Sequence, residues 1–407
     1  MASTKEFVEF VADQMRQAGE ISCRKMFGEY GIYCNGKIIG TVEHDQLYLK
    51  ITKEGQALMP EAPVESPHKG SNMLRIDDVE DAARLAAMVR ATYAALPEPK
   101  PKKAPQKKKE RAAKGDSKAK TADAASKLST AKQEADAESP AGEEIALIRL
   151  TKENLQSEHI CCALSQAEQV QSKKRWLADA MEQGLAFVKG DVRGKCFIEY
   201  LPAEAAWAPV AAQDCMYIDC LWVAGQWKGR GLGDRLLKTC IDDSRARGMR
   251  GIVAISSRKK RSFLNDPSYL KHRGFIVVDR AEPDFELLYL PLTENSAPKE
   301  TECMPQFLPQ AKEGRLPKEE SEAGFVLYYT KQCPFTVKYI PLLEKAAEAE
   351  GISLSVRHVD SIETAKACPA PWTTFALFFN GEYLTNEIMT VDKFLKLARE
   401  KVEILPH

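Results

Sequence analysis

Three glycines at alternate positions, Gly229, Gly231 and Gly233, stand directly before a leucine-rich segment in the stretch VAGQWKGRGLGDRLL. Closely spaced glycines let the backbone approach a ligand without side chains in the way, and the free N–H groups at a helix start bind anions. The flanking pattern is a buried strand (CMYIDCLWV), the glycine turn, a helix over 232–247 closed by Gly248, and a second buried strand (GIVAIS). The stretch therefore predicts an anion-binding turn at a helix N-terminus.

Two common phosphate-binding motifs do not fit this turn. A P-loop needs Lys and then Ser or Thr after its second glycine, but Asp234 follows Gly233. A dinucleotide-binding turn would place its third glycine at position 234 and an acidic residue after the next strand, which ends in Ser256-Ser257. An ordinary strand–turn–helix without a ligand is the remaining alternative.

The segment from Gln226 to Gly231 resembles the Q/R-x-x-G-x-G/A signature of the GNAT superfamily of acyl-CoA-dependent N-acyltransferases. In that family the backbone amides of this turn bind the pyrophosphate of coenzyme A, and the end of the preceding strand holds the pantetheine arm. The resemblance implies acetyl-CoA as co-substrate, bound by Leu221, Trp222, Val223, Gln226, Lys228, Gly229, Arg230, Gly231, Leu232 and Gly233.

The implied reaction is attack of an amine on the thioester carbonyl, which needs a base for the ammonium and an acid for the leaving thiolate. Glu199 and Asp219 lie inside apolar strand patterns, where a carboxylate requires either a partner or a function, so they are the candidate bases. Structural carboxylates are the alternative. Many relatives have a tyrosine acid four residues before the Gly-Phe pair. Here Leu270 stands at that position and Tyr269 one residue earlier, which makes Tyr269 the candidate acid.

The strings FIEYLPAEAAW, YLKHRGFIVVD and PDFELLYLPL, together with the glycine turn, are similar to the acetyltransferase part of YoaP-type proteins over about 150 residues.

The later stretch GFVLYYTKQCPFTVKYIPLL resembles the thioredoxin fold and the C-terminal domain of the same proteins. Cys333 there falls at a helix N-terminus, which predicts a lowered pKa. Thr336 replaces a second motif cysteine, and Pro369 or Pro371 is expected at a cis-proline position beside Cys368. Cys333 and Cys368 are thus the redox candidates, with domain docking as the alternative.

The string MFGEYGIYCNGKIIGTV closely resembles the TfoX N-terminal domain, which implies a binding or regulatory role. The following Lys-, Ala-, Pro- and Glu-rich stretch is nearly free of large apolar side chains and predicts a disordered linker. Its lysines could contact nucleic acid weakly through phosphates, but a run of solvated charges is the favoured interpretation. The expected organisation is a TfoX-like domain (1–96), a linker (97–143), a GNAT domain (144–293), a second linker (294–323) and a YoaP-like thioredoxin-fold domain (324–403).

Composition narrows the class of protein. The 407 residues carry 58 basic and 58 acidic side chains, so there is no global charge argument for nucleic acid. The sequence contains no run of about 18 apolar residues, which argues against a membrane span. Eleven cysteines without paired spacing indicate reduced thiols and a cytoplasmic location. No pattern indicates a metal.

The predicted class is α/β multidomain: an α+β TfoX-like domain, a mixed-sheet GNAT fold and a thioredoxin-like α/β domain. Two functions stay open. One is an N-acetyltransferase that acts on a small-molecule or protein amine, with a regulatory protein partner at the TfoX-like domain. The other is a non-catalytic regulatory or thiol-binding protein that uses a coenzyme A-binding fold.

Overall fold

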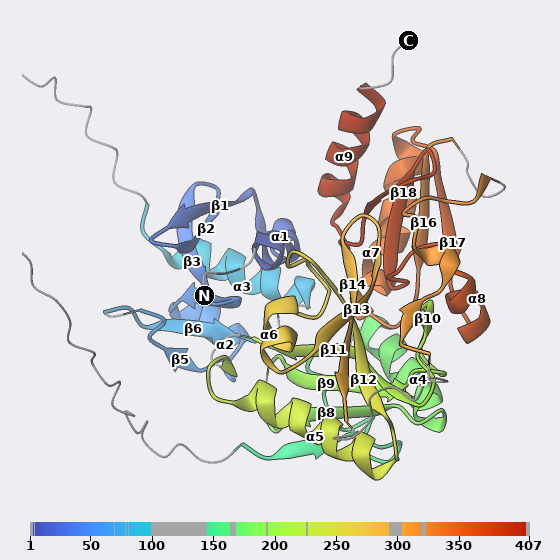
Figure 1. The fold of residues 1–407 in the computed structure, drawn as a ribbon. Helices are drawn as coiled ribbons and strands as arrows, with labels where there is room; N and C mark the ends of the chain where they lie inside the picture. Colours follow the sequence, from blue (N-terminus) through green and yellow to red (C-terminus); the bar gives the residue numbers. More distant parts are fainter. Residues whose placement is uncertain are drawn as a thin grey trace, which may run out of the picture.

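The computed structural model describes residues 3–98, 145–292 and 303–403, apart from 4, 69, 78, 80, 163–167, 193, 225–226 and 319–322. These residues form three larger sheets with their helices and one two-stranded sheet, and we call the three parts the N-terminal unit (3–98), the central unit (145–292) and the C-terminal unit (303–403) (Figure 1). Most of the predicted linker over 97–143, with its lysine-rich half, lies outside the described residues.

The N-terminal unit is a six-stranded antiparallel sheet in the order β1-β2-β3-β4-β6-β5. Its strands are β1 (Ile21–Met26), β2 (Glu29–Cys34), β3 (Lys37–Glu43), β4 (Gln46–Lys50), β5 (Val64–Glu65) and β6 (Met73–Ile76). Helices α1 (Lys5–Gln14) and α3 (Ala82–Ala95) share an apolar core with the sheet, and α2 (Lys53–Leu58) precedes β5. Asn35 and Gly36 form the hairpin turn between β2 and β3, and both have left-handed backbone angles, φ 47° and 79°.

The central unit is a seven-stranded mixed sheet in the order β13-β14-β12-β11-β9-β8-β7. Its strands are β7 (Leu147–Arg149), β8 (Ala186–Gly190), β9 (Cys196–Pro202), β11 (Cys215–Val223), β12 (Gly251–Ser257), β13 (Ile276–Ala281) and β14 (Phe285–Pro291). Only β11 and β12 pair in parallel, and α5 (Leu232–Ala246) connects them.

Both faces of the central sheet are covered, which explains the continuous apolar run of β11. Helix α4 (Glu168–Glu182) packs on one face through Trp176 and Leu177, and α5 packs on the other through Leu236 and Leu237. The predicted helix after the glycine turn is confirmed, and Gly248 follows it with φ 70°.

The C-terminal unit has the sheet order β17-β16-β18-β19, in which β16 and β17 are parallel and the other pairs antiparallel. In chain order its elements are β16 (Phe325–Tyr329), α7 (Pro334–Ala349), β17 (Leu354–His358), α8 (Ile362–Ala367), β18 (Phe375–Phe379), β19 (Glu382–Thr385) and α9 (Val391–Glu403). This order is consistent with the predicted thioredoxin-like arrangement. Helices α7 and α9 share one face of the sheet, and Cys368 packs on the other.

The predicted second linker is not a loose connection where it is described. Residues 306 and 307 form β15 (Gln306–Phe307), which pairs with β10 (Val210–Ala211) of the central unit. Phe307 is fully buried, and Leu316 packs into the core of the C-terminal unit. Apolar side chains between the prolines therefore fix this segment to both units.

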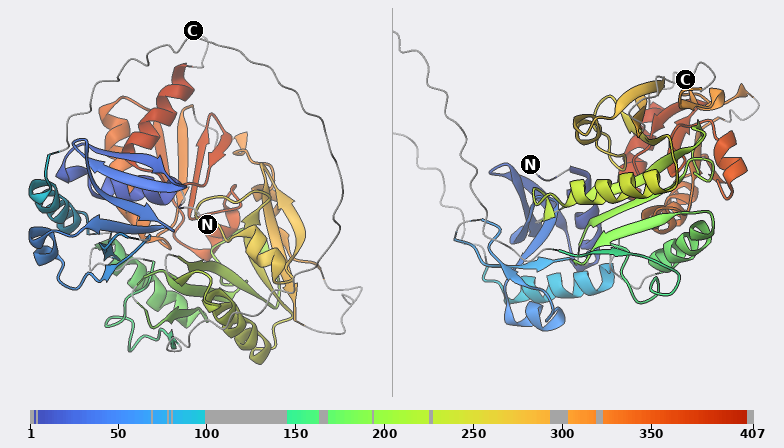
Figure 2. Two further views of the ribbon diagram at one scale, coloured as in Figure 1. Left: turned by 90° about the vertical axis from the view of Figure 1, so that its left-hand side faces the viewer. Right: turned by 60° about the horizontal axis from the view of Figure 1, so that its bottom comes forward.

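The three units contact one another, and the views of Figures 1 and 2 both show them side by side. Tyr339 of α7 donates a hydrogen bond to Asp13, next to the end of α1, at 2.8 Å. Lys366, at the end of α8, donates to the carbonyl oxygen of Val210 at 2.9 Å. At the junction of all three units the ring of Phe335 lies edge-on to Phe10 and to Phe263, with centroid distances of 5.0 and 6.2 Å.

Candidate active site

The glycine turn ends at the first residue of α5. Gly229 and Gly231 have φ angles of 76° and 71°, which L side chains rarely adopt, and a Cβ atom on either would meet nothing within 4 Å. Gly231 is the N-cap residue of α5 and supplies no side-chain cap. The turn thus presents backbone and the positive end of a 15-residue helix to open space, as an anion site requires. Gln226 lies outside the described residues.

The two basic side chains of the turn already have neighbours. Lys228 forms an ion pair with Asp45 of the N-terminal unit, with Nζ and Oδ2 2.9 Å apart. The guanidinium of Arg230 lies over the ring of Trp227, 5.3 Å from its centroid. Lys228 and Arg230 were both predicted to bind coenzyme A, and Lys228 also pairs with a residue of the N-terminal unit.

Strands β11 and β12 separate at the end where the pantetheine arm was predicted. Their pairing covers residues 215–218 of β11, whereas β11 continues to Val223. The backbone in the gap is not entirely free, because the N–H of Leu221 donates to Oδ1 of Asn265 at 3.0 Å. Asn265 is itself fixed by Ser256, whose hydroxyl donates to its carbonyl oxygen at 2.7 Å. Sequence reasoning missed Asn265, although the Asn-Asp-Pro run before α6 (Pro267–His272) marks a turn.

Tyr269 of α6 reaches the start of α5. Its hydroxyl donates a hydrogen bond to Oδ1 of Asp234 at 2.9 Å, and Asp234 also forms an ion pair with Arg273. Burial, and then the Asp234 carboxylate, raise the pKa of Tyr269 well above its ordinary value. Its proton is committed to Asp234, which does not favour the predicted role as general acid.

Glu199 and Asp219 lie together, and their partner is Lys173 of α4. The ammonium of Lys173 is 2.7 and 2.8 Å from the two carboxylate oxygens of Glu199. Lys173 is 2% exposed, Glu199 1% and Asp219 9%. Their charges therefore interact with little screening by water. A register shift of β11 against β9, between Ile218 and Cys220, places Asp219 at a bulge.

The surroundings of this carboxylate pair raise the pKa of one member, Asp219. Burial and then the negative charge of Glu199 raise the pKa of Asp219 to about 8, although Lys173 opposes them. Burial alone would lower the pKa of Lys173, but the surrounding acidic groups, Glu199 first, raise it. Near pH 7 the raised pKa keeps Asp219 largely protonated beside the Lys173–Glu199 ion pair. Lys173 was not predicted, although a lysine on the apolar side of a helix beside Trp176 signals a buried partner.

The C-terminal unit covers this cluster with the turn that precedes α7. Nε2 of Gln332 lies 3.5 Å from Oδ1 of Asp219, and Cys333 is the N-cap residue of α7. Trp222 of β11 packs against the core of the C-terminal unit together with Cys333. The predicted site residues on β9 and β11 and the predicted redox cysteine thus meet at one boundary.

Two predictions about the C-terminal unit are wrong, and the two redox candidates do not lie together. Burial raises the pKa of Cys333 to about 11, which outweighs the helix N-terminus and the N–H groups of Phe335 and Thr336. Cys368 belongs to the core on the opposite face of the sheet from α7 and Cys333, so it cannot resolve an oxidised Cys333. Glu282–Pro283 is the one cis peptide among the described residues, so neither Pro369 nor Pro371 is cis.

The comparisons with known proteins match the three units in turn. The TfoX N-terminal domain family matches residues 13–96, the Acetyltransferase (GNAT) family matches residues 152–275, and the YoaP-like family matches residues 354–396. The chain is 43% identical over 253 residues to "Uncharacterized N-acetyltransferase YoaP" of Bacillus subtilis (strain 168), which spans 61% of this chain and 97% of that protein. The chain belongs to the YoaP-type N-acetyltransferases of the GNAT family. The prediction of an N-acetyltransferase is confirmed at the level of the family.

Other similar proteins cover single parts of the chain. "Uncharacterized 12.7 kDa protein in trpE 5'region" of Spirochaeta aurantia is 34% identical over 109 residues, 26% of this chain and 95% of that protein. Among solved structures, the PaiA N-acetyltransferase of Thermoplasma acidophilum in complex with coenzyme A is 15% identical and covers 36% of this chain and 99% of its own, with a TM-score of 0.28. The GNAT family N-acetyltransferase YhbS of Escherichia coli, in complex with CoA, is 14% identical and covers 42% and 92%, with a TM-score of 0.29.

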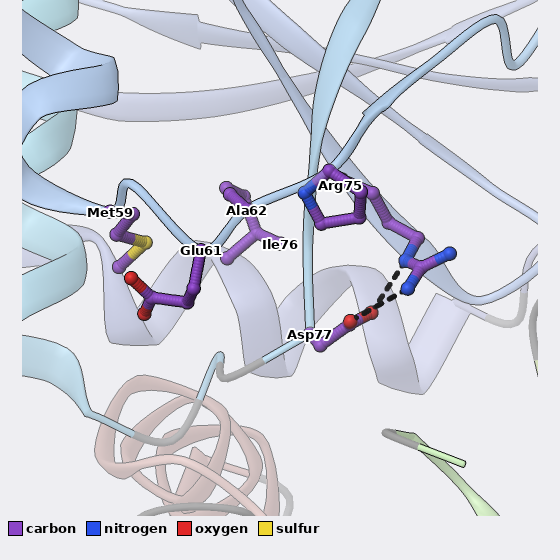
Figure 3. A pocket seen from close by; sticks show the side chains of 7 residues that line it. Met59, Glu61, Ala62, Arg75, Ile76 and Asp77 are labelled. Atoms are coloured by element: carbon purple, nitrogen blue, oxygen red, sulfur yellow. Dashed lines mark hydrogen bonds and ion pairs between the residues drawn. The ribbon is translucent and has the colours of Figure 1, made fainter.

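The N-terminal unit has a small hollow beside β6, lined by Met59, Glu61, Ala62, Pro63, Arg75, Ile76 and Asp77 (Figure 3). The guanidinium of Arg75 is turned toward Asp77, with Nε and Oδ1 2.8 Å apart, and it also pairs with Glu65. These charges satisfy one another, so the hollow offers no acid, base or nucleophile prepared for catalysis.

Two further observations concern the described part of the chain. Among the helices described, none is long and apolar enough to cross a membrane. In the same residues, no three His, Cys, Asp or Glu side chains gather as metal ligands would.

Proposed function

We propose that the central unit transfers an acetyl group from acetyl-CoA to a small amine. The observation that carries this proposal is the uncapped start of α5, with Gly229 and Gly231 open to solvent, beside the end of β11 that separates from β12. The pyrophosphate would bind the N–H groups from Gly229 to Gly233, and Lys228 would exchange Asp45 for a phosphate. The pantetheine arm would follow Leu221 to Val223.

We assign the base to the carboxylate pair. The ammonium of the acceptor would lose its proton to Asp219, and the free amine would attack the thioester carbonyl carbon. The C–S bond then breaks, and coenzyme A leaves as a thiolate that takes up a proton. A base with a pKa of about 8 is well matched to an amine near neutral pH, because it is basic enough to accept the proton and still partly ionised. We assign Tyr269 to fixing Asp234 at the helix start.

The domain boundaries and the accessory roles belong to the same proposal. The N-terminal unit would bind a regulatory partner and reaches the coenzyme A turn through Asp45. A cytoplasmic location is supported by the eleven free cysteines.

The test is product formation from acetyl-CoA and a panel of small amines, read by mass spectrometry. Asp219→Asn should lower kcat/KM by at least about 100-fold, the usual size of a general-base contribution. Asp242→Asn removes an exposed carboxylate of α5 that pairs with Lys238 and should leave the rate unchanged. The wild-type rate should rise with pH toward a plateau above pH 8, a dependence that Asp219→Asn should lose.

Two outcomes would contradict the proposal. Full activity of Asp219→Asn would remove the assigned base. Acetyl-CoA binding without any acetylated amine would favour the alternative, a regulatory protein that uses the fold to bind coenzyme A.

A further inference from the structure

Two cysteines from different units lie within electrostatic reach of the carboxylate pair. Cys162 of the central unit is buried, and its carbonyl oxygen accepts a hydrogen bond from Lys195 at 3.3 Å. Lys195 in turn lies over the ring of Trp222, 5.1 Å from its centroid, and both Trp222 and Cys333 pack against the core of the C-terminal unit. Cys162 is also close enough to Lys173 and Cys333 for their charges to act on it. Two thiols, from different units, therefore line one boundary.

The same boundary holds a buried polar group without a partner. The hydroxyl of Tyr217 on β11 has no hydrogen-bond partner, and the residue is fully buried. It lies within electrostatic reach of Asp219 and Glu199. Leaving a buried hydroxyl unpaired costs about 1–3 kcal/mol, so such groups usually meet a ligand or water. Tyr217 thus points to a polar ligand beside the carboxylates.

We propose that the acceptor site lies at this boundary between the central and C-terminal units, and that its acceptor is a small aminothiol. The ammonium faces Glu199 and Asp219, and the sulfur faces Cys162 and Cys333. This inference rests on the proposed function and names the substrate class of the same site.

The chemistry of the two ends separates an aminothiol from other amines. The carboxylate end can hold and deprotonate an ammonium. The other end offers thiols and the indole of Trp222, which are polarizable and poor hydrogen-bond partners. A hydroxyl buried there would lose its bonds to water without replacement, whereas a thiol loses little. Acetylation of a plain amine would not require the second unit to bring Cys333 to this point.

The first test compares three amines of similar size by mass spectrometry of the acetylated amide, with a control lacking enzyme: cysteamine, ethanolamine and propylamine. We expect kcat/KM for cysteamine to exceed that for either analogue by at least about 10-fold, the discrimination a single group in a matched pocket supplies. Cys333→Ala should reduce the cysteamine-to-propylamine ratio to near one. Cys368→Ala, on the opposite face of the C-terminal sheet, should keep the wild-type ratio. Cys333→Ser provides a second variant if Cys333→Ala does not fold.

The second test uses the disulfide of the same aminothiol. The Cys333 sulfur attacks cystamine, a mixed disulfide forms, the cystamine S–S bond breaks, and one cysteamine leaves as a thiolate that takes up the Cys333 proton. Peptide mass spectrometry then gives the labelling of Cys333 relative to the exposed Cys303. That ratio should be higher with cystamine than with bis(2-hydroxyethyl) disulfide, because only cystamine carries ammonium groups for Glu199 and Asp219.

The outcomes separate this inference from the proposed function. Equal turnover of the three amines, or a cysteamine preference that survives Cys333→Ala, overturns the aminothiol site and leaves amine acetylation standing. Equal labelling ratios for the two disulfides also overturn it. Failure to bind acetyl-CoA contradicts the proposed function itself.

Discussion

The ammonium of Lys173 neutralises a carboxylate that has almost no access to water, so its removal should be costly. In Lys173→Met the shape of the side chain is largely kept, but Glu199 remains buried beside Asp219 without a positive charge. Breaking a buried pair by removing one partner typically costs about 3–5 kcal/mol. We expect a loss in this range, which is a large part of the stability of an ordinary domain.

Two further variants separate the charge from the packing. Lys173→Met with Glu199→Gln removes both charges and should recover most of the loss, to within about 1–2 kcal/mol of the wild type. Lys238→Met breaks the pair with Asp242 on the exposed side of α5, where the two side chains are 73% and 52% exposed. An exposed pair one helical turn apart contributes about 0.3–0.5 kcal/mol, so this control should barely change stability.

Urea unfolding followed by tryptophan fluorescence is a suitable assay, because all five tryptophans lie between residues 176 and 372 and report on the central and C-terminal units. Differences in midpoint at a common slope give the change in free energy of unfolding. A Lys173→Met variant that loses no more than the Lys238→Met control would refute the buried charge cluster. A double variant as unstable as Lys173→Met would show that packing, not charge, accounts for the loss.

Two predictions concern the same boundary. The folded protein holds the proton of Asp219 up to about pH 8, whereas the unfolded chain releases it at about pH 4, so wild-type stability falls as the pH rises between these values. As the pH rises across that range, the free energy of unfolding of Asp219→Asn should therefore increase relative to that of the wild type, and the difference should be constant above it. Thermal melts at several pH values measure this difference. A difference that is the same at every pH would contradict the raised pKa. Brief iodoacetamide treatment near pH 7.5 should alkylate the exposed Cys303 well before Cys333, whose pKa desolvation raises to about 11, and the reverse order would contradict the raised pKa of Cys333.

Local requirements made the glycine turn before α5 predictable from sequence. The positive φ angles at Gly229 and Gly231 are a property of the turn itself, and the helix that follows is set by the spacing of its leucines. The strand–turn–helix–strand order around the turn follows the same logic, because one connecting helix between two buried strands favours a parallel pair.

The partners of the site residues are non-local and were not predictable. Lys173 is 26 residues from Glu199 in the chain, and Asn265 is 44 residues from Leu221. Cys333 was predicted from its own helix to have a lowered pKa, but another unit buries it, and burial has the larger effect. Cys368, the other redox candidate, packs on the opposite face of the sheet from Cys333.

Titration calorimetry of acetyl-CoA into the wild type and Gly231→Glu tests the central claim most directly. A side chain at Gly231 has open space, so the variant should fold with a strain of about 1–2 kcal/mol while it places a negative charge at the proposed pyrophosphate site. Gly248→Glu is the matched control, because Gly248 has nearly the same φ and the same open space at the other end of α5. We predict that Gly231→Glu weakens binding at least about 30-fold, corresponding to about 2 kcal/mol, while Gly248→Glu binds like the wild type. Equal affinity of the wild type and a folded Gly231→Glu would place coenzyme A elsewhere and contradict the account.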